Sequence, residues 1–167
     1  AELRGTVTDC FSSANLTSTG YTAGVAATNF GSVANCYASG NLTSDTLAGG
    51  LVAYNDGTDA SLSHSVAANE QISISSQTGN GMRVLAGSRN GARLPATGDN
   101  LALERMIISV NGVAQQIYED PMNGATTSGD LLRQAKTYQE MGWNFTKTWT
   151  LTGSDMPQLK GIDAVSG

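Results

Sequence analysis

Charged side chains are scarce in this sequence. Asp, Glu, Lys and Arg make up 14% of its 167 residues, whereas an average soluble domain has about 25%. Only nine residues are basic, and the formal net charge is −5. Proteins hold nucleic acids and anionic membrane surfaces through clusters of positive charge. The charge balance therefore predicts no nucleic-acid partner.

Long apolar runs are also missing. No stretch approaches the roughly 18 consecutive apolar residues of a membrane-spanning helix, so we expect no membrane insertion of this fragment. The first residues, Ala1–Arg4, lack the basic start and the apolar run of a secretion signal. We interpret the chain as a mature segment or fragment of a larger parent chain, whose other domains are further partners and carry the targeting signals.

Cysteine and histidine are rare as well, with two Cys and one His. Two cysteines do not make a disulfide scaffold, and a single histidine limits any catalytic triad. The nucleophile motif Gly-x-Ser-x-Gly does not occur either. The sequence therefore predicts a protein that is not an enzyme, with no catalytic, cofactor-binding or metal-binding residues and no cofactor.

Glycine and apolar residues are plentiful, with 20 glycines and 40% hydrophobic residues. Disordered chains instead combine low hydrophobicity with high net charge. Glycine supplies the unusual backbone conformations of tight turns. The composition predicts a sheet-rich protein with neutral polar faces and frequent turns.

An internal repeat provides the strongest signal. The segment Gly5–Phe11 (GTVTDCF) recurs 26 positions later as Gly31–Tyr37 (GSVANCY). Two further pairs share this offset: Asn15–Thr17 recurs as Asn41–Thr43, and Ala23–Ala27 recurs as Gly49–Ala53. Three matches at one offset indicate a structural unit that is repeated along the chain.

A third copy is degenerate. Ser63–Ala67 and Asn69 lie 28 positions after their partners in the second copy, and the closing run Leu85–Gly91 lies 34 positions after its partner. The change of offset predicts an insertion between Ile74 and Asn80. Because such insertions commonly carry function on a regular scaffold, residues 72–93 are the predicted location of a binding site.

In this register His64 occupies the position of Cys10 and Cys36, so the three side chains are expected to stack in neighbouring coils. One interpretation is a metal site, although zinc sites usually have closely spaced cysteines and a fourth ligand. The alternative is an internal ladder of small buried side chains, since free cysteine behaves as a small hydrophobe. A disulfide between Cys10 and Cys36 is a further alternative.

The repeat predicts the fold. Its runs are short, rich in Val, Ile, Thr, Tyr and Ala, and lack helical periodicity. Short strands cannot bury an apolar face alone, but units stacked about 4.8 Å apart bury a continuous column of side chains. We expect an all-β, parallel β-solenoid (β-helix) of about three coils over residues 1–98, with repeats at about 5–30, 31–56 and 57–91. A β-sandwich also uses short strands but does not explain a repeat.

The remaining segment, residues 99–167, departs from the repeat. Arg105–Val110, closed by Asn111 and Gly112, is predicted to form a final strand and turn. Thr126–Gly142 is predicted to be helical, with Thr127 or Ser128 as its cap, a face of Leu131, Leu132, Ala135, Tyr138 and Met141, and Gly142 at its end. Aromatic residues gather after this helix. We expect the segment to cap an open end of the solenoid, because exposed strand edges promote aggregation.

Several segments resemble the GLUG repeat of bacterial surface proteins. They are Asn35–Gly40 (NCYASG) and Ala48–Gly57 (AGGLVAYNDG) in the second copy, and Arg105–Gly112 (RMIISVNG), Met141–Phe145 (MGWNF), Trp149 and Met156–Gly161 (MPQLKG) in the tail. The resemblance covers nearly the whole chain. It implies an extracellular repeat region of adhesin-like proteins on the bacterial cell surface, and the family supplies no catalytic residues to carry over.

The expected function is a non-catalytic adhesive or spacer module of a bacterial surface protein. An alternative is a carbohydrate- or host-protein-binding module attached to a surface protease or glycosidase, with a host glycan or glycoprotein as partner. A polysaccharide-cleaving β-helix is a third hypothesis, but no acidic residues of the repeats form a matched pair. The turn Asn55–Asp59 has the oxygen ligands of a calcium loop, or it is an ordinary tight turn, for which Asn and Asp are typical.

Overall fold

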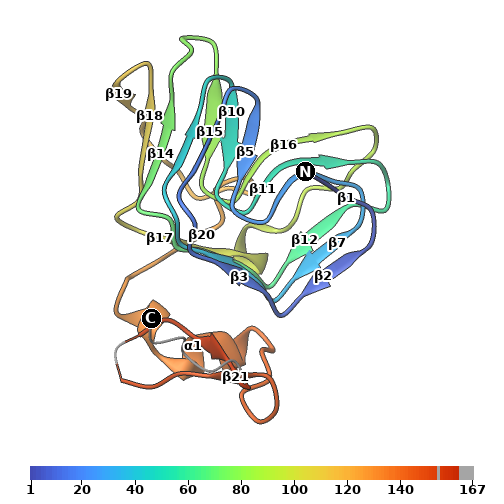
Figure 1. Cartoon of the computed structure of the whole chain (residues 1–167), viewed down its shortest axis with the longest axis vertical. Helices are drawn as coiled ribbons and strands as arrows, with labels where there is room; N and C mark the ends of the chain where they lie inside the picture. Colours follow the sequence, from blue (N-terminus) through green and yellow to red (C-terminus); the bar gives the residue numbers. More distant parts are fainter. Residues whose placement is uncertain (154, 162–167) are drawn as a thin grey trace.

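The repeated segments stack as the coils of a parallel β-solenoid. The computed structural model describes residues 1–153 and 155–161; residue 154 and residues 162–167 of the predicted tail lie outside them. Successive coils place their short strands side by side and parallel in five sheets (Figure 1). Among the described residues there is a single short α-helix. The predicted all-β solenoid of about three coils is confirmed.

Each of the first three coils contributes one strand to each sheet. Sheet A contains β1 (Glu2–Leu3), β6 (Ala26–Asn29), β11 (Val52–Asp56) and β16 (Leu85–Arg89). Sheet B contains β2 (Thr6–Thr8), β7 (Ser32–Ala34) and β12 (Ser61–Ser63). Sheet C contains β3 (Phe11–Ser12), β8 (Tyr37–Ala38), β13 (Val66–Ala67), β17 (Leu101–Leu103) and β20 (Ala125–Thr127). Sheet D contains β4 (Leu16–Ser18), β9 (Leu42–Ser44), β14 (Gln71–Ile74), β18 (Ile107–Val110) and β19 (Val113–Ala114). Sheet E contains β5 (Tyr21–Ala23), β10 (Leu47–Gly49) and β15 (Asn80–Met82).

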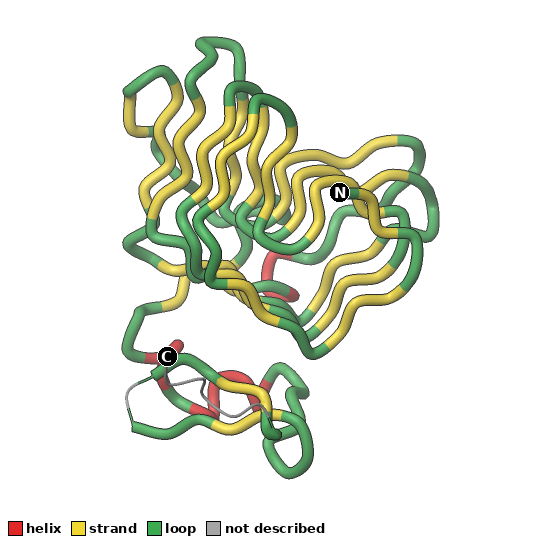
Figure 2. The backbone as a smooth tube through the Cα atoms, in the orientation of Figure 1, coloured by secondary structure: helices red, strands yellow, loops and turns green. Residues whose placement is uncertain are grey.

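The path of a coil is L-shaped. Figure 1 shows sheets D and E facing each other across one arm of the L, and sheets A and B across the other, with sheet C joining the arms. Figure 2 shows the strands of all five sheets following one another around this path as nearly parallel layers. Each arm is therefore a narrow, two-sided column that is filled by side chains from both of its sheets.

The register between the first two coils is the predicted offset of 26 residues. The expected neighbours are adjacent. Val7 pairs with Val33, and Leu16 pairs with Leu42. Hydrogen bonds join the other two positions: Tyr37 N–H donates to the Cys10 carbonyl over 3.1 Å, and Val25 N–H donates to the Leu51 carbonyl over 2.9 Å. Because parallel strands place equivalent residues side by side, the sequence repeat becomes columns of like side chains.

The third coil follows the predicted pattern with a correction of one residue. Val33 pairs with Leu62, an offset of 29 rather than 28, and Val52 pairs with Leu85, an offset of 33 rather than 34. The predicted insertion between Ile74 and Asn80 is confirmed, because the offset from the second coil rises there from 30 to 33. After the insertion, pairing with the second coil continues at the new offset of 33 residues.

Apolar columns fill the interior. In sheet D the buried residues Leu42, Ile72 and Ile108 lie on successive coils. At the junction of sheets A and B, the stacked carboxamides of Asn29 and Asn55 are also fully buried, and Asn29 Nδ2 donates to Asn55 Oδ1 over 2.9 Å. A buried amide is costly unless it is hydrogen-bonded. The Asn29–Asn55 hydrogen bond links the two coils and offsets part of this cost, while the buried Asn55 Nδ2 has no partner among the described residues.

The two ends of the solenoid differ. Strands β1 to β5 of the first coil each form the outer edge of their sheet. At the other end, the Met122 carbonyl accepts hydrogen bonds from the N–H groups of Val84 (3.1 Å) and Leu85 (3.0 Å). Buried Arg83 donates from Nε to the Asn123 carbonyl over 3.0 Å. The segment around Met122 thereby closes the C-terminal end.

The predicted strand and turn at Arg105–Gly112 are present as β18 followed by a tight turn. Asn111 and Gly112 both adopt positive φ, at 50° and 78°, and the chain returns antiparallel as β19. Positive φ at both central residues is typical of a type I′ hairpin turn, for which Asn-Gly is a preferred pair. The Asn-Gly signal in the sequence therefore marks a hairpin.

The predicted helix at Thr126–Gly142 is mostly wrong. Its first residues extend β20, which pairs with β17, and a 3₁₀ turn follows at Leu131–Arg133. Only α1 (Ala135–Glu140) is α-helical, although Gly142 does end it, with φ of 91°. Residues 125–127 instead form backbone hydrogen bonds with the edge of β17. Helix propensity, which depends on nearby residues alone, does not account for these bonds.

The tail covers a side of the solenoid and not an open end. The outward row of sheet C consists of Phe11, Tyr37, Val66 and Leu101, which pair in register. Against this row pack the tail residues Leu132, Tyr138, Trp143 and Trp149. The inward row of the same sheet is alanine, at Ala38, Ala67 and Ala102. In Figure 1 the tail accordingly lies beneath sheet C.

Among the described residues, three side-chain hydrogen bonds attach the tail after β20 to the coils. Trp149 Nε1 donates to Asp9 Oδ1 over 3.1 Å, and Trp143 Nε1 donates to the His64 carbonyl over 2.7 Å. In the opposite direction, the Tyr37 hydroxyl donates to the Pro157 carbonyl over 2.7 Å. The antiparallel pair β21 (Trp149–Thr150) and β22 (Gln158–Leu159) carries one of these contacts, through Trp149, and Pro157 lies immediately before β22. Within the described residues, none of the helices is long and apolar enough to cross a membrane.

Removing the Trp149 side chain should destabilise the whole molecule, because this indole is fully buried between the tail and sheet C. We expect Trp149→Ala to lower the free energy of unfolding by about 3–5 kcal/mol, measured by urea denaturation. Lys147→Ala, an exposed position two residues away, is the control and should behave like the parent chain. A change within error for Trp149→Ala would mean that the tail is a loosely attached appendage.

Candidate functional site

The structure does not bring His64 together with the two cysteines as predicted. The residue opposite Cys36 in the third coil is Ser65, whose Oγ accepts a hydrogen bond from the Cys36 N–H over 3.2 Å. His64 is exposed and occupies the same coil position as Asp9 in the first coil and Asn35 in the second, which is one residue before the position of Cys10 and Cys36. Asp9, Asn35 and His64 all adopt positive φ, between 51° and 56°. The turn conformation therefore sets the register, which a residue-by-residue match missed.

Cys10 and Cys36 lie on neighbouring coils as free thiols. Cys36 is fully buried and its Sγ donates to the Ala34 carbonyl over 3.1 Å, whereas Cys10 is exposed and donates to the Thr8 carbonyl over 3.3 Å. Burial raises the pKa of the Cys36 thiol to about 12. The buried-ladder interpretation therefore describes Cys36 and Ser65, but not exposed Cys10 or His64.

The Asn55–Asp59 turn commits its main carboxylate to other side chains. Asp56 Oδ2 accepts from Arg89 Nε over 2.7 Å, and Asp56 Oδ1 accepts from Asn90 Nδ2 over 2.7 Å. These hydrogen bonds, with that from Asn90 first, lower the pKa of Asp56 below its ordinary value. A calcium ion at this turn would have to displace both contacts. The ordinary-turn interpretation fits the geometry.

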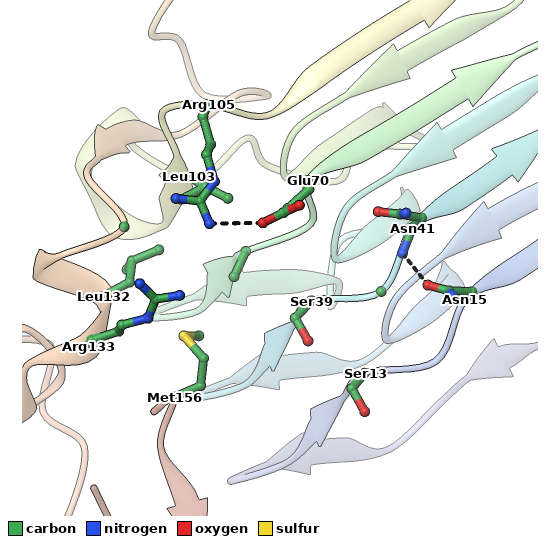
Figure 3. Close-up of a pocket in the computed structure, with 13 residues that line it drawn as sticks. Ser13, Asn15, Ser39, Asn41, Glu70, Leu103, Arg105, Leu132, Arg133 and Met156 are labelled. Carbon is green, nitrogen blue, oxygen red and sulfur yellow. Dashed lines mark hydrogen bonds and ion pairs between the residues drawn. The ribbon is translucent and has the colours of Figure 1, made fainter. Parts of the chain in front are cut away.

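A groove at the corner between sheets C and D is the strongest candidate site. It has a volume of about 340 Å³, within the range of small-ligand pockets. Three successive coils form one wall and the tail forms the other (Figure 3). The lining residues are Ser13, Asn15, Ser39, Gly40, Asn41, Ala68, Glu70, Leu103, Arg105, Gly129, Leu132, Arg133 and Met156.

The coil wall presents polar side chains in a repeated order. Ser13 and Ser39 follow the sheet C strands of the first two coils, and Asn15 and Asn41 lie two positions further on. Asn15 Oδ1 accepts from the Asn41 N–H over 2.8 Å. The Asn41 carboxamide and the two serine hydroxyls make no hydrogen bond to another described residue. The groove therefore offers polar groups repeated at the coil spacing of about 4.8 Å.

The corner itself is rigid because two coils approach closely there. A Cβ atom on Gly40 would lie 1.7 Å from the Ala14 carbonyl oxygen, so only glycine fits. On the other side, buried Asn69 donates from Nδ2 to the Gly40 carbonyl over 2.7 Å. Gly40 is thus held between the first and third coils, and the neighbouring Ser39 and Asn41 have a fixed backbone.

Positive charge comes from both sides of the groove, through Arg105 after β17 and Arg133 in the tail. Arg105 Nη2 binds Glu70 Oε1 over 2.8 Å, and the Arg105 guanidinium lies against Gly129, where a Cβ would come within 2.9 Å of Nη1. Arg133 comes from the 3₁₀ turn of the tail and is exposed. The ion pairs of the described residues do not include Arg133. Figure 3 shows both arginine side chains at the groove.

The floor between the two walls is apolar. Leu103 and Leu132 are almost completely buried, and Ala68 and Met156 lie beside them. Leu103 belongs to the last coil and Leu132 to the tail, so the floor exists only because the tail packs on sheet C. The groove therefore combines an apolar base, a neutral polar wall and a cationic rim, which suits an amphipathic ligand.

The predicted site at residues 72–93 does not contribute to this groove. From the third coil, only Ala68 and Glu70 line the groove, and both precede the insertion. Ser39 and Asn41 do belong to the repeat, yet the match at an offset of 26 was interpreted as a marker of the fold alone. Polar residues that recur where apolar columns are expected could have indicated a binding face; the tail side of the groove had no comparable signal.

Comparison with family models, curated proteins and solved structures finds no match to this chain. The resemblance to the GLUG repeat accordingly remains a prediction. Glu70 is the one carboxylate among the described lining residues of the groove and is paired with Arg105, whereas glycoside hydrolysis ordinarily needs two carboxylates flanking the bond.

Thiol labelling should separate the two cysteines. With iodoacetamide at about pH 8.5, we expect exposed Cys10 to react while Cys36 does not, because its pKa of about 12 leaves almost no thiolate and its sulfur is buried. Mass spectrometry of chymotryptic peptides measures both rates, because cleavage after aromatic residues such as Phe11 separates the two cysteines. Unfolding in urea should make the two rates equal. Equal rates in the folded protein would contradict the assigned coil register.

The Asp56 contacts should appear as a pH-dependent stability. Because the folded-state pKa of Asp56 is lowered, its stabilisation is present above the ordinary value of 3.8 and is lost as the pH falls below it. We expect Asp56→Asn to lower the melting temperature at neutral pH, and this deficit to shrink in acid. Asp59→Asn, an exposed position in the same turn, is the control and should melt like the parent chain.

The same melting experiment examines the calcium hypothesis. With Asp56 bound to Arg89 and Asn90, addition of EDTA should leave the melting temperature of the parent chain unchanged. A fall of several degrees on chelation, reversed by added calcium, would show that the turn binds the ion.

Proposed function

We propose that this chain is a non-catalytic adhesive module of a bacterial cell-surface protein, acting outside the cell. In this proposal the solenoid is the scaffold, and the groove between sheets C and D binds an extended polar ligand such as a host glycan or glycoprotein. A spacer would need only a stack of coils. The observation that favours adhesion over a spacer is the groove, in which polar groups of successive coils and the tail converge.

The ligand class follows from the composition of the groove. Hydroxyl and carboxamide groups such as Ser39 and Asn41 both donate and accept hydrogen bonds, which matches the hydroxyl groups of sugars. The apolar floor at Leu103 and Leu132 suits the less polar face of a sugar ring. A carbohydrate-binding module beside a surface protease or glycosidase would use the same groove, and the parent chain would decide between these two settings.

The proposed location outside the cell, on the bacterial surface, rests on the resemblance to the GLUG repeat. The GLUG-like segments fall on the coil that forms the centre of the groove wall, Asn35–Gly40, and on the tail, where Met156 lines the groove. The resemblance therefore concerns the same parts of the chain that carry the proposed function. A bacterial surface setting also agrees with a neutral, Thr- and Ser-rich exterior.

Binding should depend on the polar wall. We expect the parent chain to bind glycans on a glycan array and mucin in a plate assay, and the double variant Ser39→Ala, Asn41→Ala to bind about 5- to 30-fold more weakly, since each lost hydrogen bond contributes about 1 kcal/mol. Neither side chain bonds another described residue, so the fold should be retained, as checked by circular dichroism.

The matched control is Thr43→Ala, two residues beyond Asn41 on β9 and outside the groove lining; its binding should equal that of the parent chain. The bound glycan should also remain uncleaved after extended incubation. Absence of binding to every glycan and to mucin would contradict the adhesive role and favour the spacer, and cleavage products would contradict the non-catalytic one.

A further inference from the structure

We propose that the groove selects carboxylated sugars, with Arg133 and Arg105 binding the sugar carboxylate. This inference rests on the proposed carbohydrate-binding function and deepens it. The chain as a whole is negative, at −5, so a site for an acidic ligand is not expected from its composition. The inference depends on where two of its nine basic residues lie.

The two guanidinium groups belong to the lining of the same groove. Arg105 reaches it from the end of β17, and Arg133 reaches it from the tail. Figure 3 shows Arg105 turned toward Glu70 and Arg133 turned from the tail toward the coil wall. Like charges facing one another repel, and an anion placed between them removes this cost. The planar fork of arginine suits a carboxylate in particular, since it can donate two parallel hydrogen bonds.

The charge inside the groove is incompletely balanced. Glu70 contacts Arg105 through one pair of atoms, Oε1 and Nη2, while Arg133 takes part in none of the ion pairs of the described residues. Glu70 and Arg105 are both more than half exposed, and such a surface pair contributes little to stability. Glu70 can therefore turn away when a ligand carboxylate arrives, and it competes with that ligand for Arg105.

An acidic peptide fits the groove less well than an acidic sugar. Peptides commonly add as a strand to a free sheet edge, but between the first and second coils the backbone at this corner is already paired. Leu16 N–H donates to the Asn41 carbonyl over 3.0 Å, and Ser39 N–H donates to the Ser12 carbonyl over 2.9 Å. What remains available is side-chain hydroxyl and carboxamide, which match sugar hydroxyls on either side of a carboxylate.

Isothermal titration calorimetry with matched probes tests the inference. Tetragalacturonic acid and its methyl ester share one sugar backbone and differ in charge and in the added methyl groups, and sialyllactose and lactose differ by one acidic sugar. We expect at least tenfold tighter binding of an acidic probe than of its neutral partner, and a loss of this preference as salt is raised. The uronate pair and the sialic acid pair distinguish the two sources of a sugar carboxylate.

Variants locate the effect. Arg133→Gln should weaken binding of the acidic probe about tenfold and so reduce the ratio of acidic-probe to neutral-probe affinity, and Arg133→Lys should recover only part of the loss. Glu70→Gln should have the opposite sign and strengthen binding of the acidic probe. Lys147→Gln, an exposed cation elsewhere on the tail, is the charge-matched control and should change neither.

The outcomes separate the two proposals. Equal binding of acidic and neutral probes, both reduced by the Ser39 and Asn41 double variant, would overturn the carboxylate inference and retain the carbohydrate-binding groove. An acidic preference that survives Arg133→Gln would overturn the role of Arg133. Binding of a poly-glutamate peptide in place of every sugar would overturn the choice of ligand class, and no binding of any sugar would remove the proposed function as well.

Discussion

Parallel stacking of one coil on the next is the constraint on which the rest of this structure depends. Each strand has only two to five residues and can neither bury an apolar face nor satisfy its backbone alone. The coil above and the coil below supply both the hydrogen bonds and the contacts. Equivalent residues such as Leu16 and Leu42 are therefore neighbours in space, and a side chain that suits one position suits the same position in the next coil.

Sheet C shows how this constraint produces two different surfaces from one strand. Its inward residues are alanines, because the sheet lies at the junction of the two arms, where space is narrow. Its outward residues form a row that begins with Phe11 and Tyr37 and is too apolar to face water. The tail covers that row with Trp143 and Trp149. The groove arises at the border of this contact, where the coil wall ends and the tail begins.

The sequence predicted the parts of the fold that are local and repeated. The offset of 26 residues, the insertion between Ile74 and Asn80 and the turn at Asn111 could all be predicted, since each depends on residues a short distance apart or on a match between copies. The errors have a common cause. The position of His64 is wrong by one residue, because the match compares side chains and not turn conformations. Thr126 is not helical because it pairs with the free edge of β17, and helix propensity does not include such a distant partner.

By itself, then, the sequence determined that coils would stack and which residues would share a column, because a repeat at constant offset has few other physical solutions. Only the tertiary structure decided where the tail would lie, and with it the candidate site. Arg133 and Asn41 are far apart in the chain and belong to no common motif. They line one groove because the aromatic residues of the tail are most stable against the outward row of sheet C, a contact between distant segments that no local pattern encodes.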